Sequence, residues 1–208
     1  MSSQPKLILA SGSRYRRELL SRLQLDFSIN TPDIDETPIA GELPIQTALR
    51  LSRQKAEASV ETAPSAVIIG SDQVANLDNE HIGKPGTHIN ALAQLKKMQG
   101  RSVVFHTALC VLDNRETQPD RRYQTIVIDT TVTFRRLSDQ QLDAYLHIEQ
   151  PYDCAGSAKN EGLGITLIEA ISSSDPTALT GLPLIALTGM LIKVGVLFFS
   201  PRVTPYSR

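Results

Sequence analysis

The longest β-branched stretches of the chain constrain its fold most. Residues 102–113 (SVVFHTALCVLD) and 123–135 (YQTIVIDTTVTFR) are rich in Val, Ile, Thr and aromatic residues, which favour extended strands. The segment between them, 114–122, holds most of the turn residues and charges of this region. We therefore predict a long β-hairpin with a flexible tip.

The remaining segments mix strand and helix signals. Apolar runs bounded by turn residues predict short strands at 6–10, 27–31, 67–70 and 165–170. Apolar side chains at helical spacing predict helices at 14–23, 44–60, 90–98, 138–149 and 183–194, with a strand-like end up to 199. Ser13 and Ser138 are the expected caps of two of these helices. The alternation indicates an α/β fold built on a mixed sheet.

Length and charge limit the classes of protein to consider. The 208 residues fit one domain, 1–208, which can have two lobes. A hydrophobic fraction of 41% and a charged fraction of 21% are typical of soluble globular proteins. The net charge is only −1, so no global basic field favours nucleic acid or a membrane surface. Any anion site must therefore be local.

The cysteines and the apolar segments indicate the cellular compartment of the protein. The two cysteines, Cys110 and Cys154, form no CxxC motif, which suits a reducing compartment. The most apolar long segment, 182–199, is interrupted by Pro183 and Lys193, so we do not expect it to span a membrane. The first residues lack the pattern of a signal peptide. We expect a cytoplasmic protein.

The first cluster of candidate functional residues lies where a predicted strand is followed by a predicted helix. It contains Ser11, Ser13, Arg14, Arg16 and Arg17. Backbone N–H groups at a helix start attract anions, and hydroxyl and guanidinium groups add hydrogen bonds suited to phosphate. The pattern alone fits a Ser cap followed by solvated arginines somewhat better.

A second cluster is acidic. Asp33, Asp35 and Glu36 lie in a loop bounded by prolines. Carboxylate oxygens are the ligands that Mg²⁺ prefers, so the loop can contribute to a divalent-cation site. A solvated turn is the simpler interpretation of this loop by itself.

The third cluster follows the strand predicted at 67–70. Asp72 and Gln73 come directly after it, and open α/β sheets bind ligands at the carboxyl ends of their strands. Asp72 can act there as a base or metal ligand, and the Gln73 amide can contact a nucleobase edge. Lys84 and Lys55 are candidate phosphate ligands. A helix cap or Asx-turn is an equally good interpretation of Asp72 alone.

The last cluster is the Gly-containing loop 150–164. Gly162 and Gly164 allow close approach of the backbone to a ligand, and Glu161 can accept hydrogen bonds from a base. The GxG lacks the third glycine of a dinucleotide fingerprint. The four histidines show no metal-ligand spacing, so we expect surface or satisfied polar residues at positions 81, 88, 106 and 147.

No serine or cysteine nucleophile motif and no Walker lysine motif occurs. Activated water is therefore the simplest nucleophile.

Together and in this order, the motifs resemble the Maf family of nucleoside triphosphate pyrophosphatases. The resemblance covers residues 6–196 and rests on LILASGSRYRRELL, DETP, RLSRQKA, IIGSDQV, GKP, FHTALCV, CAGSAKNEGLGITL and GLPLIAL. It implies an elongated, twisted mixed sheet flanked by helices, with two lobes and a cleft, related to the inosine triphosphatases. It also makes a homodimer plausible.

Ser71-Asp72-Gln73 is similar to the 7-methyl-GTP branch of that family, whereas the dTTP/UTP branch typically has Ala-Asp-Thr. The resemblance associates Tyr15, Gln73 and Glu161 with specificity. N7-methylation makes the purine cationic, which suits an aromatic face such as Tyr15. A carboxylate such as Glu161 complements the guanine N1–H and amino group.

The implied reaction is hydrolysis of 7-methyl-GTP to 7-methyl-GMP and diphosphate. Asp72 would be the general base, and Glu36 with Asp72 would hold a divalent cation, Mg²⁺ or Mn²⁺. The remaining expected phosphate ligands are Arg16, Arg17, Lys55, Lys84, Ser11 and Ser13. Two alternatives stay open: a dTTP/UTP pyrophosphatase, or a non-catalytic nucleotide-binding regulator of cell division. Arg14 stands where the family often has Pro, and we assign no role to 114–122 or to the residues after 196.

Overall fold

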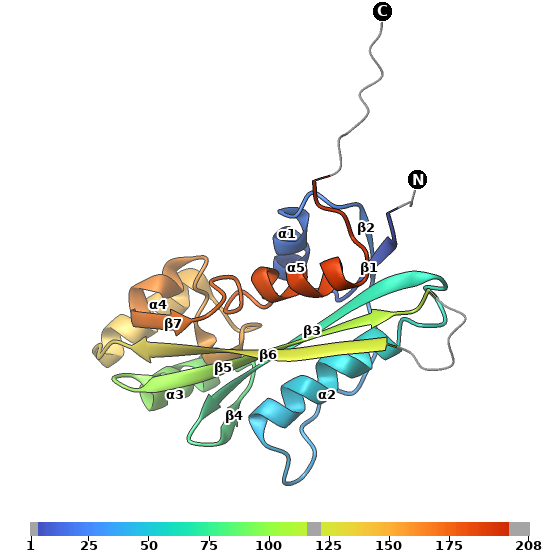
Figure 1. Cartoon of the computed structure of the whole chain (residues 1–208). Helices are drawn as coiled ribbons and strands as arrows, with labels where there is room; N and C mark the ends of the chain where they lie inside the picture. Colours follow the sequence, from blue (N-terminus) through green and yellow to red (C-terminus); the bar gives the residue numbers. More distant parts are fainter. Residues whose placement is uncertain (1–3, 116–121, 200–208) are drawn as a thin grey trace, which may run out of the picture.

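The computed structural model describes residues 4–115 and 122–199, and one mixed sheet runs through all of it (Figure 1). The strands are β1 (Lys6–Ala10), β2 (Phe27–Asn30), β3 (Ala66–Leu77), β4 (Glu80–Ile82), β5 (Ser102–Asp113), β6 (Arg122–Phe134) and β7 (Ile168–Ser173). Their order is β2-β1-β3-β5-β6-β7, with β4 paired to β3. β1 pairs in parallel with β2 and β3, and every other pairing is antiparallel.

Helices cover both faces of this sheet. They are α1 (Arg14–Ser21), α2 (Pro44–Glu57), α3 (His88–Met98), α4 (Asp139–Glu149) and α5 (Leu184–Lys193), with 3₁₀ turns at Ala155–Ser157 and Leu163–Leu167. The predicted caps are confirmed: Ser13 accepts from the N–H of Arg16, and Ser138 from that of Gln141. No helix among the described residues is both long and apolar enough to cross a bilayer.

Alternating residues of the parallel strands explain the first lobe. Leu7 and Leu9 of β1 pack with α1 and α5 on one face, whereas Ile8 and Ala10 pack toward α2 on the other. Figure 1 shows α1 and α5 on one side of the sheet and α2 on the opposite side. Burial on both faces is why β1 reads as a continuous apolar run rather than an alternating one.

The second lobe lies at the other end of the long strands. The later half of β3, the start of β5 and the end of β6 join β4, β7, α3 and α4 around a separate apolar core. The molecule is therefore elongated (Figure 1), with an α/β architecture of two lobes on one shared sheet.

Three sequence predictions need correction. The strand predicted at 67–70 is β3, and it continues to Leu77 because β5 pairs with it along that length. The strand predicted at 165–170 begins only at Ile168, because a 3₁₀ turn precedes it. The segment from 194 to 199 contains no strand. The tip of the predicted hairpin, 116–121, lies outside the described residues.

Candidate active site

The site begins with an unusually close contact between α2 and β3 at Gly70. A Cβ atom on Gly70 would lie 2.2 Å from the backbone oxygen of Ser52 and 2.9 Å from the backbone nitrogen of Ala56. The helix backbone therefore rests directly on the strand, which only glycine permits. Side chains alternate along a strand, so Asp72 points to the same face as Gly70. Lys55, next to Ala56, consequently meets Asp72.

Lys55 lies between two carboxylates. Its Nζ is 2.6 Å from Oδ1 of Asp72 and 2.6 Å from Oε1 of Glu36. Lys55 and Asp72 are buried, while the Glu36 side chain is half-exposed. Burial raises the pKa of Glu36, but Lys55, Lys84 and Arg16 outweigh this effect and hold the pKa below its ordinary value. Two acidic groups that are distant in the sequence thus converge on one ammonium group.

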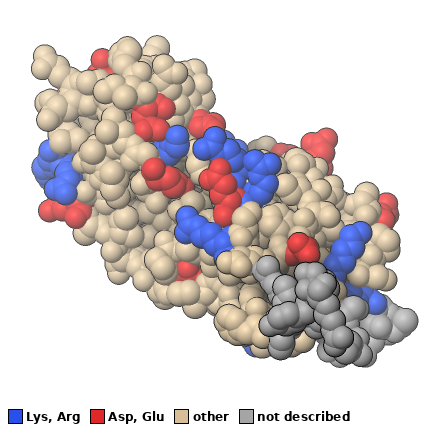
Figure 2. Space-filling view, turned by 90° about the horizontal axis from the view of Figure 1, so that it is seen from above, with Lys and Arg blue, Asp and Glu red and all other residues tan. Residues whose placement is uncertain are grey.

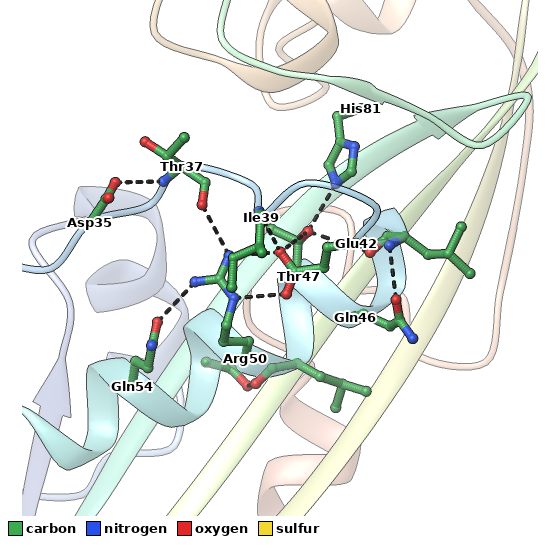
Figure 3. A network of polar contacts seen from close by, with 12 residues as sticks. Asp35, Thr37, Ile39, Glu42, Gln46, Thr47, Arg50, Gln54 and His81 are labelled. Atoms are coloured by element: carbon green, nitrogen blue, oxygen red, sulfur yellow. Dashed lines mark hydrogen bonds and ion pairs between the residues drawn. The ribbon is translucent and has the colours of Figure 1, made fainter.

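The loop that carries Glu36 is fastened to α2 by a charged network (Figure 3). Glu42 accepts from Arg50 at 2.7 and 2.8 Å, from the Thr47 hydroxyl at 2.8 Å and from the Ile39 N–H at 3.1 Å. These bonds lower the pKa of Glu42 to about 2, chiefly through Arg50. The network fixes the end of the acidic loop.

Arg50 carries the network back toward Glu36. Its Nη2 donates to the backbone oxygen of Thr37 at 3.1 Å, and the Thr37 N–H donates to Asp35 at 2.9 Å (Figure 3). Both residues flank Glu36 in the sequence. The carboxylate of Asp35 is therefore part of the loop's own turn, which fits the simpler interpretation of this acidic cluster.

The turn from β1 into α1 forms the opposite wall. Arg16 donates through Nε to the backbone oxygen of Gly181 at 2.9 Å and through Nη1 to the Ser11 hydroxyl at 3.3 Å. Burial lowers the pKa of Arg16, while Asp72 and Glu36 oppose that shift. The guanidinium is thus a fixed cation facing the acidic pair. Ser13 caps the same helix.

Gln73 lies on the face of β3 opposite Asp72. Its amide nitrogen donates to Thr107 Oγ1 at 2.9 Å and lies 3.0 Å from the backbone oxygens of Ala178 and Leu179. The amide hydrogens are therefore used within the protein. Among the described residues, the Gln73 oxygen accepts no hydrogen bond, so this atom is the one left for a ligand.

A cavity of about 780 Å³ connects these walls. β1 ends its pairing at Ala10 opposite Gly70, and β4 pairs with β3 only from Ala75 to Leu77, so among the described residues this edge of β3 is unpaired at residues 71–74. The open edge that results lets one cavity reach both Asp72 and Gln73. Its volume falls within the range of small-ligand sites. Figure 2 shows basic and acidic side chains mixed across the middle of one face, rather than a continuous basic surface.

The far side of the cavity belongs to the Gly-containing loop. Lys159 pairs with Glu149 at 2.9 Å, and Glu149 also accepts from the Leu163 N–H at 2.7 Å. Tyr15 lies near this loop: burial raises its pKa first, and Cys154 and Glu161 add to the shift while Lys159 opposes it. Tyr15, Lys159 and Glu161 therefore place an aromatic ring, a cation and a carboxylate at the same end of the cavity.

Comparison with known proteins identifies the family of the chain. The family model described as Maf-like protein matches residues 6–194. The chain belongs to the Maf family. A relative from Cupriavidus metallidurans, named 7-methyl-GTP pyrophosphatase, is 63% identical over 93% of this chain and 95% of its own length. A Ralstonia nicotianae relative of the same name is 61% identical over 92% of this chain and 96% of its own length. The solved structure of the Staphylococcus aureus Ham1 protein has 15% identity and a TM-score of 0.43, covering 62% of this chain and 71% of that chain.

The structure brings most of the predicted site residues of this Maf protein to one cavity. Those that line it are Ser11, Ser13, Tyr15, Arg16, Glu36, Lys55, Asp72, Gln73, Lys84 and Glu161. Arg17 does not line it, whereas Arg14, the first residue of α1, does. Asp72 lies inside β3 rather than at the end of a strand.

Sequence reasoning missed Lys159, although it lies inside the motif AGSAKNEGLG. It also missed a group outside the cavity: His88, Asp143 and His147 lie close enough together to hold a metal ion. The expectation of surface or satisfied polar residues fits all four histidines. His81 is 2.9 Å from Thr47 and His106 is 2.7 Å from Asp129, while His88 is 2.8 Å from Asp143 and His147 is exposed. Sequence spacing could not indicate that His88 and His147 lie together, because they belong to different helices.

Proposed function

We propose that this Maf protein hydrolyses 7-methyl-GTP to 7-methyl-GMP and diphosphate. The observation that carries the proposal is the position of Lys55 between Asp72 and Glu36 at the edge of a nucleotide-sized cavity. The relatives named 7-methyl-GTP pyrophosphatase, which match nearly the whole chain, support this choice of substrate.

The triphosphate would lie among the cations of the cavity. Arg16 and Lys55 are buried or half-buried, whereas Lys84 is 65% exposed at the mouth and 4.0 Å from Glu36. Ser11 and Ser13 stand at the start of α1, where N–H groups also favour phosphate. These residues would orient the α-phosphorus for in-line attack.

Asp72 would act as general base. It would take a proton from a water molecule whose oxygen forms a bond to the α-phosphorus. The bond from the α-phosphorus to the bridging oxygen breaks, and diphosphate leaves. Lys55 fixes the direction of the Asp72 carboxylate through the 2.6 Å contact with Oδ1.

A divalent cation fits the free oxygens of the acidic pair. Glu36 and Asp72 each give one oxygen to Lys55. The second oxygen of Glu36 and a remaining lone pair of Asp72 can face a hard ion such as Mg²⁺ or Mn²⁺, which leaves Asp72 one more lone pair for the proton that it takes from water. When bound, the ion would neutralise charge that develops on the phosphate oxygens.

The methylated base would lie at the end of the cavity formed by Tyr15 and Glu161. The aromatic face attracts the cationic purine, and the exposed Glu161 carboxylate complements its N–H donors. The free oxygen of Gln73 would accept one further hydrogen bond. A cytoplasmic location and a homodimer remain part of the proposal.

A nucleotide panel tests the proposal. The purified protein is incubated with Mg²⁺ and 7-methyl-GTP, GTP, UTP, dTTP or inosine triphosphate, and diphosphate release is measured. We expect 7-methyl-GTP to be preferred and chelation by EDTA to abolish turnover. Preference for UTP and dTTP would favour the other branch. Tight binding of nucleotides without diphosphate release would favour a non-catalytic regulator.

A further inference from the structure

A cluster of metal-ligating side chains lies outside the cavity, between α3 and α4. His88 is the first residue of α3, and Asp143 and His147 are one turn apart on α4. One ligand atom from each residue lies within 4.8 Å of the other two. We propose that these three side chains bind one first-row transition-metal ion, with Zn²⁺ as the representative.

Hydrogen bonding prepares His88 to be a ligand. The Tyr152 hydroxyl donates to the backbone oxygen of Leu146 at 3.2 Å, so its only hydrogen is used there. Nδ1 of His88, 3.1 Å from the same hydroxyl, must then be the donor. In the neutral ring this leaves the lone pair on Nε2. Fixing a histidine through its other nitrogen is the usual arrangement around protein metal sites.

The atoms that face each other require a cation between them. Nε2 of His88 is 2.8 Å from Oδ1 of Asp143, and Nδ1 of His147 donates to the backbone oxygen of Asp143 at 2.9 Å, so the lone pair of a neutral His147 ring is also on Nε2. Because Nδ1 of His88 carries the hydrogen that is donated to Tyr152, the Nε2 lone pair of a neutral ring would face an oxygen of the Asp143 carboxylate, which is unfavourable. Either a proton or a metal ion must bridge them, and a second imidazole is within reach of the same position.

The ligand set selects the class of ion. Two imidazoles and one carboxylate suit Zn²⁺, Co²⁺ or Ni²⁺, whereas Mg²⁺ prefers oxygen ligands only. This cluster is therefore chemically distinct from the Glu36–Asp72 pair. Three protein ligands leave a coordination position for water. The side chains are 30%, 46% and 68% exposed for His88, Asp143 and His147, so an ion can reach them from solvent.

A bound ion would fasten the start of α3 to α4. The turn that contains Lys84 is attached to the same region, because the Gly86 N–H donates to the backbone oxygen of Tyr152 at 3.0 Å. Binding to the folded state alone stabilises it, so the melting temperature should rise with the concentration of Zn²⁺.

The test uses the untagged full-length protein, stripped of metal with EDTA and dialysed. With excess Mg²⁺ present to saturate the oxygen site, Zn²⁺ is titrated by calorimetry, and Co²⁺ binding is followed by its visible absorption. We expect one ion per chain. His147→Gln and Asp143→Asn should weaken binding at least about tenfold, since even outer-shell partners are worth that much. Tyr152→Phe should weaken binding while leaving all three ligands present.

Asp139→Asn is the matched control. Asp139 lies on the same helix and pairs with Lys96 at 2.7 Å, but it is not a ligand, so affinity should be unchanged. His147 is exposed, so its variant should fold normally. Failure of the wild-type protein to bind Zn²⁺ would overturn the proposal, and so would undiminished affinity in His147→Gln.

Discussion

Lys55 of α2 and Asp72 of β3 form a buried ion pair of 2.6 Å beside the close backbone contact between helix and strand at Gly70. The pair therefore depends on the absence of a side chain two residues away. Removing a buried charge partner is costly, because the remaining charge has lost both water and its counter-ion. Glu36 shares the same ammonium group and extends the arrangement into the acidic loop.

Gly70→Ala should separate α2 from β3. The added methyl group would overlap the Ser52 backbone oxygen, so we expect a loss of about 1–3 kcal/mol in unfolding free energy and a large loss of turnover. Gly189→Ala on α5 is the control, because nothing lies within 4 Å of its Cβ position and alanine favours helix. Thermal melts and diphosphate release measure both effects. Equal behaviour of the two variants would contradict the close contact.

Glu42→Gln should loosen the loop that carries Glu36. Loss of the charged bonds to Arg50 should cost about 2 kcal/mol in stability. The wild-type pKa of about 2 is below the ordinary value of 4.5, so this contribution is complete above pH 4.5 and disappears as the pH falls toward 2. The stability difference between wild type and variant, measured by urea unfolding, should shrink over that interval.

The matched control for Glu42 is Glu18→Gln. Its partner Arg14 is exposed, and such helix pairs contribute only about 0.3–0.5 kcal/mol. A difference between wild type and Glu42→Gln that stays constant from pH 5 to pH 2 would show that the Glu42 network is not formed.

Glu149→Ala should affect substrate binding more than chemistry. Glu149 holds Lys159 and the backbone of Leu163, so its loss frees the loop next to Tyr15 without touching Asp72. We expect KM for 7-methyl-GTP to rise about tenfold with kcat nearly unchanged, the pattern of lost uniform binding. Steady-state kinetics test this, and a selective fall in kcat would argue against a positioning role.

Much of the fold follows from local patterns. The hairpin strands, the buried run 6–10 and the capped helix after Ser138 depend on neighbouring residues, so their sequence signals are strong. The full length of β3 depends on its pairing with β5, a segment distant in the sequence. Because residues 71–73 are polar, the predicted strand ended at Gly70. Tertiary packing, including the contact at Gly70, brings Glu36 and Asp72 together. The resemblance of the motifs to a known family indicated this convergence, but the spacing of the two residues in the sequence could not. The histidine cluster gave no signal because helix packing alone assembles it.

Glu161→Gln should change specificity. The variant keeps the shape of the side chain but removes the charge that complements a methylated, cationic guanine. We expect kcat/KM for 7-methyl-GTP to fall by about tenfold or more, the equivalent of one charged hydrogen bond, while that for UTP changes little. An unchanged ratio between the two substrates would remove Glu161 from the base-binding set.

Turnover of Asp72→Asn tests the central claim most directly. Asparagine keeps the size of the side chain, and Glu36 remains to pair with Lys55, so the fold should persist by circular dichroism. With 7-methyl-GTP and Mg²⁺, kcat should fall by about two to four decades, as expected for loss of a general base. Full turnover by a folded Asp72→Asn protein would contradict the assignment of Asp72 and the mechanism built on it.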